Sequence, residues 1–134
     1  MPLFMVDTDI CSYVMKRSNK RLLKKLAGVP LAEVCMSVVT KAELLFGVRV
    51  SPDPARDSRA LDGLLTYVDV MEFSEGSAVH YADIRADLKR QGKMIGANDL
   101  LIAAHARSLG LTLITNNTQE FSRVEGLALE NWTG

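Results

Sequence analysis

Short apolar runs alternate with longer segments of helical periodicity along this chain, and this alternation restricts its fold more than any other feature. The runs predict short buried strands at residues 3–6, 34–37, 67–73, 111–114 and 128–132. The intervening segments predict helices at residues 10–15, 20–27, 39–48, 55–65, 75–91 and 98–109, with a loop and a short helical turn at 115–121. Strands joined by helices pair in parallel, because each connection must cross back over the sheet. The sequence therefore predicts an α/β fold with a parallel sheet.

The predicted helices end at residues that commonly stop a helix. Gly92 and Gly110 follow two of them, and Gly47 lies near the end of a third. Residues 51–54, Ser-Pro-Asp-Pro, form the clearest loop. We find no repeat, low-complexity tract or linker in the 134 residues, a length that suits one hydrophobic core. We expect a single domain over residues 1–134.

Charge and cysteine content narrow the class of protein. The formal net charge is zero, which argues against bulk affinity for nucleic acid. No apolar stretch is long enough to span a membrane, and the N-terminus lacks the basic region of a signal peptide. Cys11 and Cys35 are too few for a zinc site and are interpreted as reduced core thiols. We expect a cytoplasmic protein that does not enter a membrane.

The cations nevertheless gather in two groups. The first comprises Lys16, Arg17, Lys20, Arg21, Lys24 and Lys25, and the second comprises Arg85, Lys89, Arg90 and Lys93. A solvated helix face explains either group as well as a binding surface does.

Acidic and polar residues follow several of the predicted strands. Asp7 lies just past the first strand and residues 115–117 lie just past the fourth. Glu43 lies in the helix after the second strand, and Asp99 opens the helix at 98–109. Ligands of parallel α/β sheets bind beyond the carboxyl ends of the strands. These residues are therefore candidates for one common site.

Each acid also has a purely structural interpretation. Asp7 and Asp9 suit the N-terminus of a helix, where Thr8 is another good cap. Residues 40–43, Thr-x-x-Glu, match a capping box, and Asn-Asp at 98–99 opens a helix as caps do.

The neighbours of Glu43 and Asp99 favour a metal site over these structural interpretations. Each acid shares its predicted helix face with apolar residues, which are Val39, Phe46 and Val50 for Glu43, and Ile102, Ala103 and Ala106 for Asp99. An unpaired carboxylate is costly in apolar surroundings, and a divalent cation would compensate several carboxylates together. Hard oxygen ligands suit Mg²⁺ or Mn²⁺.

Carboxylate-held Mg²⁺ activates a bound water and neutralises charge that develops on a phosphate. The acids thus point to phosphodiester hydrolysis. The sequence contains no nucleophilic triad or glycine-rich phosphate loop, and His80 and His105 are interpreted as structural.

Four motifs in family order then resemble the VapC-type PIN domains. They are Asp7-Thr8-Asp9-Ile10, Ser37-x-x-Thr40-x-x-Glu43, Asn98-Asp99-x-x-Ile102-Ala-Ala-His105, and Thr115-Asn-Asn117-x-x-Glu120-Phe121. The resemblance runs from the first strand almost to Trp132.

The resemblance implies a three-layer α/β/α sandwich around a mainly parallel sheet of four to five strands. It also implies a Mg²⁺-dependent endoribonuclease toxin that acts on tRNA or other structured RNA, forms a homodimer and is silenced by a VapB-like antitoxin. By position, Asp7, Glu43, Asp99 and Asn117 would be catalytic, and Asp7 and Asp99 would hold the metal. Asn98 and Thr115 would line the site.

Two positions depart from the family pattern. Many PIN domains carry an acid where Asn117 stands, and Asp9 replaces the more usual Asn. The missing carboxylate could be supplied by Asp9 or by Glu120, and the sequence leaves both open.

Two other functions remain open from the sequence. One is a phosphatase of the haloacid dehalogenase type, with Asp7 as nucleophile and Asp9 as acid/base, although Cys11 breaks its motif. The other is a non-catalytic module, either PIN-like or similar to a receiver domain. The neutral Asn117 is the one departure that favours the PIN-like module.

Overall fold

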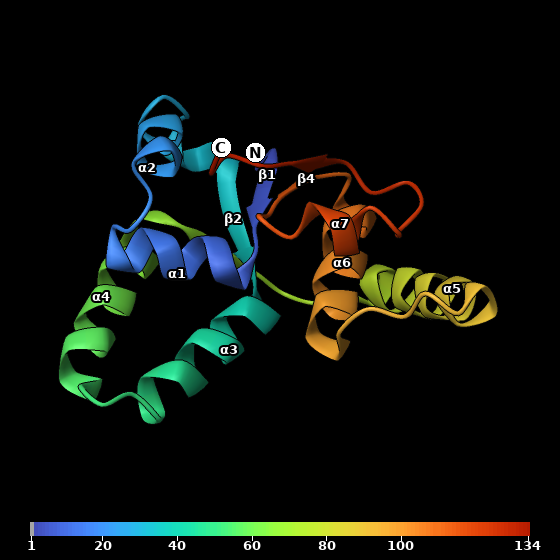
Figure 1. Ribbon diagram of the computed structural model, residues 1–134, viewed down its shortest axis with the longest axis horizontal. Helices are drawn as coiled ribbons and strands as arrows, with labels where there is room; N and C mark the ends of the chain where they lie inside the picture. Colours follow the sequence, from blue (N-terminus) through green and yellow to red (C-terminus); the bar gives the residue numbers. More distant parts are fainter. Residues whose placement is uncertain (1) are drawn as a thin grey trace.

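The computed structural model describes residues 2–134, and its centre is a five-stranded sheet in which every pairing is parallel. The strands are β1 (Phe4–Val6), β2 (Val34–Ser37), β3 (Asp69–Met71), β4 (Thr112–Ile114) and β5 (Leu129–Glu130). Their spatial order is β3-β2-β1-β4-β5, so β1 lies in the middle between β2 and β4. The three central strands therefore end at the same edge of the sheet (Figure 1).

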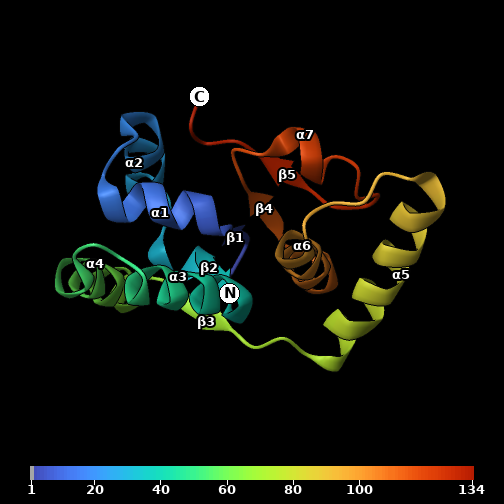
Figure 2. The same ribbon diagram turned by 60° about the horizontal axis from the view of Figure 1, so that its bottom comes forward.

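Helices cover both faces of this sheet, which confirms the three-layer α/β/α arrangement. They are α1 (Thr8–Lys16), α2 (Lys20–Ala27), α3 (Val38–Arg49), α4 (Pro54–Tyr67), α5 (Glu75–Gln91), α6 (Ala97–Leu109) and α7 (Thr118–Phe121), with a short 3₁₀ turn at Leu31–Glu33. Figure 2 shows α1, α2 and α4 on one side of the sheet and α5 and α6 on the other. None of the helices in residues 2–134 combines the length and apolarity needed to cross a bilayer.

The alternation of side chains along the strands creates two cores. Met5 of β1 packs with Leu113 against α5 and α6, whereas Val6 packs with Ile114 against α1, α2 and α4. Cys11 lies in the second core, and both it and Cys35 are buried free thiols, as expected. Burial raises the pKa of each thiol well above its usual value.

The helices next to the strand ends begin at caps that the sequence only partly predicted. Asp7 caps α1, because its carboxylate accepts a hydrogen bond from the Ile10 amide at 2.9 Å. Ser37 caps α3 through the Val39 amide at 3.1 Å, so the predicted capping box at residues 40–43 is wrong. Because β2 runs directly into α3, the helix begins three residues earlier than that box requires.

The predicted element bounds are confirmed at residues 20–27, 34–37 and 75–91. The strand predicted at 67–73 is wrong at its start, because α4 continues through Tyr67 and β3 covers Asp69–Met71 alone. Asp53 caps α4 with Pro54 at its first position, so this helix is longer than predicted at both ends.

Candidate active site

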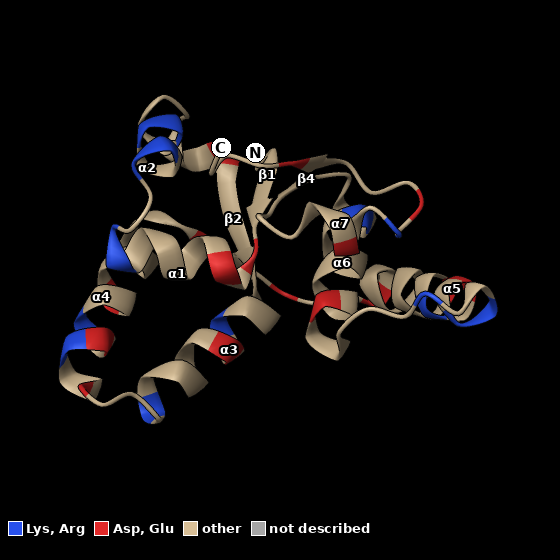
Figure 3. Cartoon of the chain, viewed as in Figure 1, with Lys and Arg blue, Asp and Glu red and all other residues tan. Residues whose placement is uncertain are grey.

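Four acidic residues from separate parts of the chain gather where β1 and β4 end. Asp7 follows β1, Glu43 comes from the middle of α3, Asp99 from the first turn of α6 and Glu120 from α7. Figure 3 shows acidic segments at the start of α1, on α3 and on α6, around the ends of the central strands. Burial raises the pKa of Asp99 most, and the charges of Glu120, Asp7 and Glu43 add to this shift, as expected for carboxyl groups that lie near one another.

Asp7 is the buried member of this group, with 3% of its surface exposed. One carboxylate oxygen accepts from the Ile10 amide at 2.9 Å, and the other accepts from the Thr115 hydroxyl at 2.6 Å. Burial raises the pKa of Asp7 to about 6, although both hydrogen bonds act in the opposite direction. The Asp7 backbone amide also donates to the Ile114 carbonyl of β4 at 3.1 Å, so both the main chain and the carboxylate of Asp7 are held in place.

Glu43 is held by residues from two other helices. Its two carboxylate oxygens accept from the Thr8 hydroxyl of α1 and, at 3.1 Å, from the Asn98 amide of α6. The expectation that Glu43 lies on a buried apolar face is wrong, since Phe46 and Val50 are 66% and 63% exposed. Glu43 lies where α1, α3 and α6 meet, and its surroundings are polar.

Asp99 is the least compensated acid of the site. The apolar face predicted for it is confirmed, because Ile102, Ala103 and Ala106 are all buried. Burial and the neighbouring Glu120 raise the pKa of Asp99 to about 7. The capping role considered for residues 98–99 is wrong, because Gly96 occupies the N-cap position and Asp99 lies inside the helix.

Glu120 lies beside Asp99, at the position left open by the neutral Asn117. It accepts hydrogen bonds from the Gly96 amide at 2.8 Å and from the Asn117 side-chain amide at 2.7 Å. These bonds lower the pKa of Glu120, so its charge persists next to Asp99. A Cβ on Gly96 would lie 3.4 Å from Asp99 Oδ2 and 3.7 Å from Glu120 Oε1.

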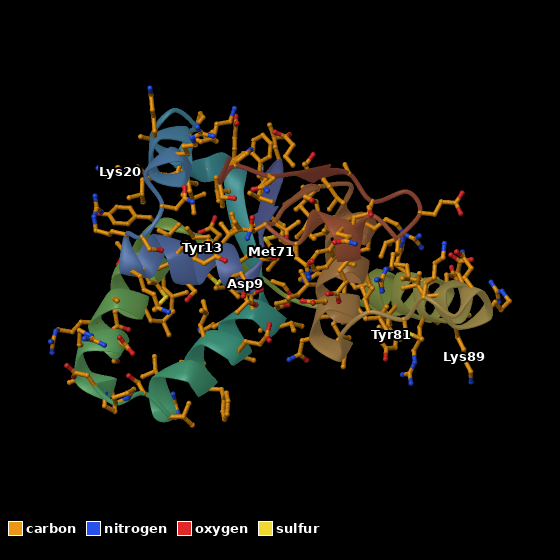
Figure 4. The ribbon with its side chains drawn as sticks, in the orientation of Figure 1. Asp9, Tyr13, Lys20, Met71, Tyr81 and Lys89 are labelled. Atoms are coloured by element: carbon orange, nitrogen blue, oxygen red, sulfur yellow. The ribbon has the colours of Figure 1, made fainter. Side chains whose placement is uncertain are left out.

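Of the two acids that could replace the missing carboxylate, the structure brings Glu120 to the site. Asp9 is exposed at the start of α1 (Figure 4) and makes no hydrogen bond to the other acids in the described residues, although its charge raises the pKa of Asp7 after the larger effect of burial. The Asn117 backbone amide also donates to the Thr115 hydroxyl at 2.9 Å, which connects Glu120 through Asn117 and Thr115 to Asp7. The contact between Asn117 and Glu120 has a signal in the sequence, because the two residues are three positions apart.

The donor set fits a hard divalent cation that retains part of its water shell. In the described residues 2–134, no group of three or more His, Cys, Asp or Glu side chains is arranged to hold one ion directly, and none of the four acids forms a salt bridge. Mg²⁺ needs only one or two carboxylates together with waters. The pKa values of Asp7 and Asp99 are both raised, as expected for carboxyl groups without a cation nearby. A bound cation would lower both pKa values.

The two histidines make structural contacts, as predicted. His105 is fully buried, and its Nδ1 lies 2.7 Å from the Ser37 hydroxyl, which itself accepts from the Val39 amide. His105 Nε2 is buried without a hydrogen-bond partner in the described residues. His80 accepts from Arg107 at 2.9 Å between α5 and α6.

Comparison with known proteins matches this geometry to one family. Residues 4–127 match the PIN domain family. The tRNA(fMet)-specific endonuclease VapC of Shigella flexneri is 39% identical over 130 residues, which cover 97% of this chain and 98% of that protein. The ribonuclease VapC2 of Haemophilus influenzae is 40% identical over 129 residues, covering 96% and 97%.

Solved structures agree with the sequence relatives. The chain superposes on DNA-bound VapBC from Salmonella typhimurium with a TM-score of 0.93, 33% identity and coverage of 98% and 99%. It superposes on VapBC2 from Rickettsia felis, bound to a promoter DNA fragment, with a TM-score of 0.91, 35% identity and coverage of 96% and 98%. This chain belongs to the PIN-domain family and, within it, to the VapC ribonucleases.

Proposed function

We propose that this chain is the toxin of a toxin–antitoxin pair and a Mg²⁺-dependent endoribonuclease that cleaves tRNA or another structured RNA. The observation that carries the proposal is the convergence of Asp7, Glu43 and Asp99, without a cationic partner in residues 2–134, at the ends of the central strands. The relative from Shigella flexneri is named for cleavage of a tRNA, which supports this class of substrate. An enzyme acting on tRNA would work in the cytoplasm.

In this proposal, Asp7 and Asp99 hold the metal, and the other polar residues orient them. The metal, when bound, supplies an activated water and neutralises charge on the phosphate. Thr115 and the Ile10 amide fix the Asp7 carboxylate, so it loses little freedom when the metal binds. Thr8 and Asn98 likewise fix Glu43, which we assign to orienting the attacking water and accepting its proton.

Asn117 and Glu120 complete the site from the α7 side. Asn117 donates to Glu120 and keeps that carboxylate beside Asp99. We assign Glu120 the part of the acid that many PIN domains carry at the position of Asn117. Asn117 then acts by positioning Glu120.

The test is cleavage of a tRNA transcript by the purified protein. Cleavage should require Mg²⁺ or Mn²⁺, stop when EDTA is added and return with excess metal. The variant Asp99→Asn should be inactive, whereas Asp83→Asn, which changes an exposed acid of α5, should retain full activity. Cleavage that continues in EDTA, or in Asp99→Asn, would overturn the proposal.

We further propose that the partner is a VapB-like antitoxin that places a cation into the acidic site and an apolar segment beside it. The two solved structures compared above are VapBC complexes. An apolar cavity of about 510 Å³ lies between α1, α2 and α4, and Cys11, Leu26 and Leu64 are among its lining residues. An Arg of the partner suits the anionic site because its planar group engages two carboxylate oxygens at once. The expected homodimer stays a prediction.

The variant Gly63→Leu tests the apolar part of this partner site. Gly63 lines the cavity on α4, and nothing lies within 4 Å of a Cβ placed there. Replacing a helical Gly should stabilise the free protein by about 0.5–1 kcal/mol. The leucine should also occupy the cavity and weaken binding of the co-expressed antitoxin about tenfold, measured by titration calorimetry. Gly63→Ala is the control, because it gives the helix gain without filling the cavity, and equal antitoxin affinity of both variants would contradict the assignment.

The phosphatase alternative fits the geometry poorly. It requires Asp7 as a nucleophile of that phosphatase fold, whereas residues 4–127 match the PIN domain family. It also requires Asp9 as the neighbouring acid/base, but Asp9 is exposed.

A further inference from the structure

The strongest concentration of positive charge in this chain lies on α2 and its junction with α1. Residues 10–32 contain six of the sixteen Lys and Arg residues and no Asp or Glu. Figure 3 shows α2 covered with basic residues, well separated from the acidic segments of the site. We define the basic face as Arg17, Lys20, Arg21, Lys24 and Lys25, all of which are exposed. Lys16 is left out because it faces Asp57 and lowers the pKa of that acid.

This arrangement disfavours α2 as an isolated helix. Lys20 and Lys24, like Arg21 and Lys25, are four residues apart on one helix face, where like charges repel. The first turn of α2 contains no acid, although acids are the residues that a helix N-terminus favours. None of the five cations forms a salt bridge in residues 2–134. The C-terminal end of the helix dipole favours Lys24 and Lys25, but no acid in the described residues pairs with the five cations, and an external polyanion would.

Three cations of the basic face line a single groove. A groove of about 390 Å³ is lined by Arg21, Lys24 and Lys25 together with Gly28 and Val29. Leu22 is fully buried beneath the helix, which fixes the orientation of α2 and keeps its cations turned outward. Lys25 also lies over the ring of Trp132, with its Nζ 5.9 Å from the ring centre, which anchors one wall of the groove.

A polar groove lies between the start of α2 and the loop that follows β4. It has a volume of about 230 Å³ and is lined by Tyr13, Ser18, Asn19, Asn116 and Thr133. Asn116 lies between the site residues Thr115 and Asn117, and Asn19 is the N-cap of α2. Figure 4 shows Asp9 near the acidic site and Lys20 at the far end of α1. The nine residues of α1 separate the two regions by roughly 13 Å.

We propose that the basic face of α2 binds the phosphate backbone of the RNA substrate at a distance from the cut, with the polar groove guiding the strand between the two regions. This proposal rests on the proposed ribonuclease function. A ligand that covers the site, the groove and the length of α2 must extend roughly 25 Å, which is about nine base pairs of an A-form RNA stem. The enzyme would therefore prefer a structured RNA over a short oligonucleotide because of this second contact. Backbone contacts position a nucleic acid without reading its sequence.

The test removes three charges from α2 and, as a matched control, three charges from α5. The α2 variant is Lys20→Gln/Arg21→Gln/Lys24→Gln, and the control is Arg85→Gln/Lys89→Gln/Arg90→Gln on the second basic group, where Asp83 and Asp87 are interleaved. Glutamine keeps helix propensity close to that of Lys and Arg. For a 25-nucleotide hairpin RNA relative to a tetranucleotide that spans the cut, the ratio of kcat/KM should fall at least tenfold in the α2 variant. It should not change in the control.

Salt dependence separates a phosphate contact from a folding defect. The slope of log(kcat/KM) for the hairpin against log salt should become shallower by about two to three in the α2 variant, one step for each lost phosphate contact. A ratio and slope equal to those of the unaltered protein would overturn the proposal.

Binding without turnover separates this proposal from the proposed function. Fluorescence anisotropy with the labelled hairpin, in the Asp99→Asn background, should show weaker binding once the three α2 charges are removed. If the protein with Asp99 intact cleaves no RNA but hairpin binding still weakens when the three α2 charges are removed, the ribonuclease proposal fails and the RNA-binding surface stands. Normal hairpin binding together with lost antitoxin binding would overturn the RNA assignment and make α2 a protein interface.

Discussion

The two carboxylates proposed to hold the metal lie in contrasting environments. Asp7 is buried at the end of β1 and accepts hydrogen bonds from Thr115 and from the Ile10 amide. Asp99 is half-buried at the start of α6, and the nearest group acting on it is another acid, Glu120. Asp7 is thus fixed before any ligand binds, whereas Asp99 is repelled by its neighbour until a cation arrives. From this contrast we infer that Asp7 positions the metal, and that relief of the repulsion at Asp99 contributes free energy to metal binding.

Replacing either acid by its amide should have the largest effect, and should separate the two environments. We expect Asp7→Asn and Asp99→Asn each to lower cleavage at least about 100-fold, because each removes a proposed metal ligand. Asp99→Asn should also stabilise the metal-free protein by about 1–2 kcal/mol at pH 7.5, since it removes the repulsion from Glu120. Urea unfolding in EDTA measures this change. Destabilisation by Asp99→Asn would show that its charge is already compensated.

The pH dependence of stability should reveal the same uncompensated charge without mutation. Folding raises the pKa of Asp7 from 3.8 to about 6 and that of Asp99 from 3.8 to about 7. Between pH 4 and pH 7 the native protein therefore binds protons that the unfolded chain has released, so stability falls as the pH rises. We expect the two groups together to cost about 2–3 kcal/mol between pH 5 and pH 7.5 in EDTA, after allowing for solvent screening.

Metal should remove much of this pH dependence, because a cation stabilises the ionised carboxylates. Thermal unfolding at the two pH values, with EDTA and with 10 mM Mg²⁺ added, compares the two conditions. The gain from Mg²⁺ should be larger at pH 7.5 than at pH 5. In Asp99→Asn the pH dependence in EDTA should shrink, and an unchanged profile in that variant would assign the effect to other groups.

The two helices whose first and last residues the sequence predicted correctly have local signals at both ends. The helix 75–91 begins after Ser74, which caps it, and ends at Gly92 with a positive φ of 65°. The helix 20–27 is capped by Asn19 and ends at Gly28. Such signals act within a few residues, so they can be interpreted without knowledge of the tertiary structure.

The errors arise where distant parts of the chain decide the outcome. An apolar pattern around Glu43 predicted a buried face, but nothing in residues 2–134 covers Phe46 and Val50. Glu120 reaches the site through the Gly96 amide, 24 residues away in sequence, and no local pattern reports that contact. The sequence predicted that Asp7 and Thr115 lie at the same edge of the sheet, because each follows a strand. The two residues do meet there, since β1 and β4 pair in parallel.

Removing the Thr115 hydroxyl should leave the Asp7 carboxylate less firmly held before metal binds. In Thr115→Val, Asp7 loses a 2.6 Å hydrogen bond that lowers its pKa, so its pKa should rise further. We expect a loss of about tenfold in kcat/KM and a shift of the acidic limb of the pH–rate profile to higher pH. Thr115→Ser keeps the hydroxyl and should retain both the activity and the profile. Equal profiles for the two variants would show that the bond does not orient Asp7.

We expect the smallest effect from Asn117→Asp, which adds a carboxylate beside Glu120 and Asp99. In Asn117→Asp the amide that donates to Glu120 is replaced by a like charge, so the metal-free protein should lose about 1 kcal/mol at pH 7.5. The same carboxylate adds an oxygen ligand near Asp99, so half-maximal activity should need a few-fold less Mg²⁺. Gln119→Glu is the matched control, because Gln119 is exposed on α7 and is not among the residues that line the polar groove. If both variants change stability and Mg²⁺ dependence equally, added charge in this segment is the cause, and Asn117 does not act through Glu120.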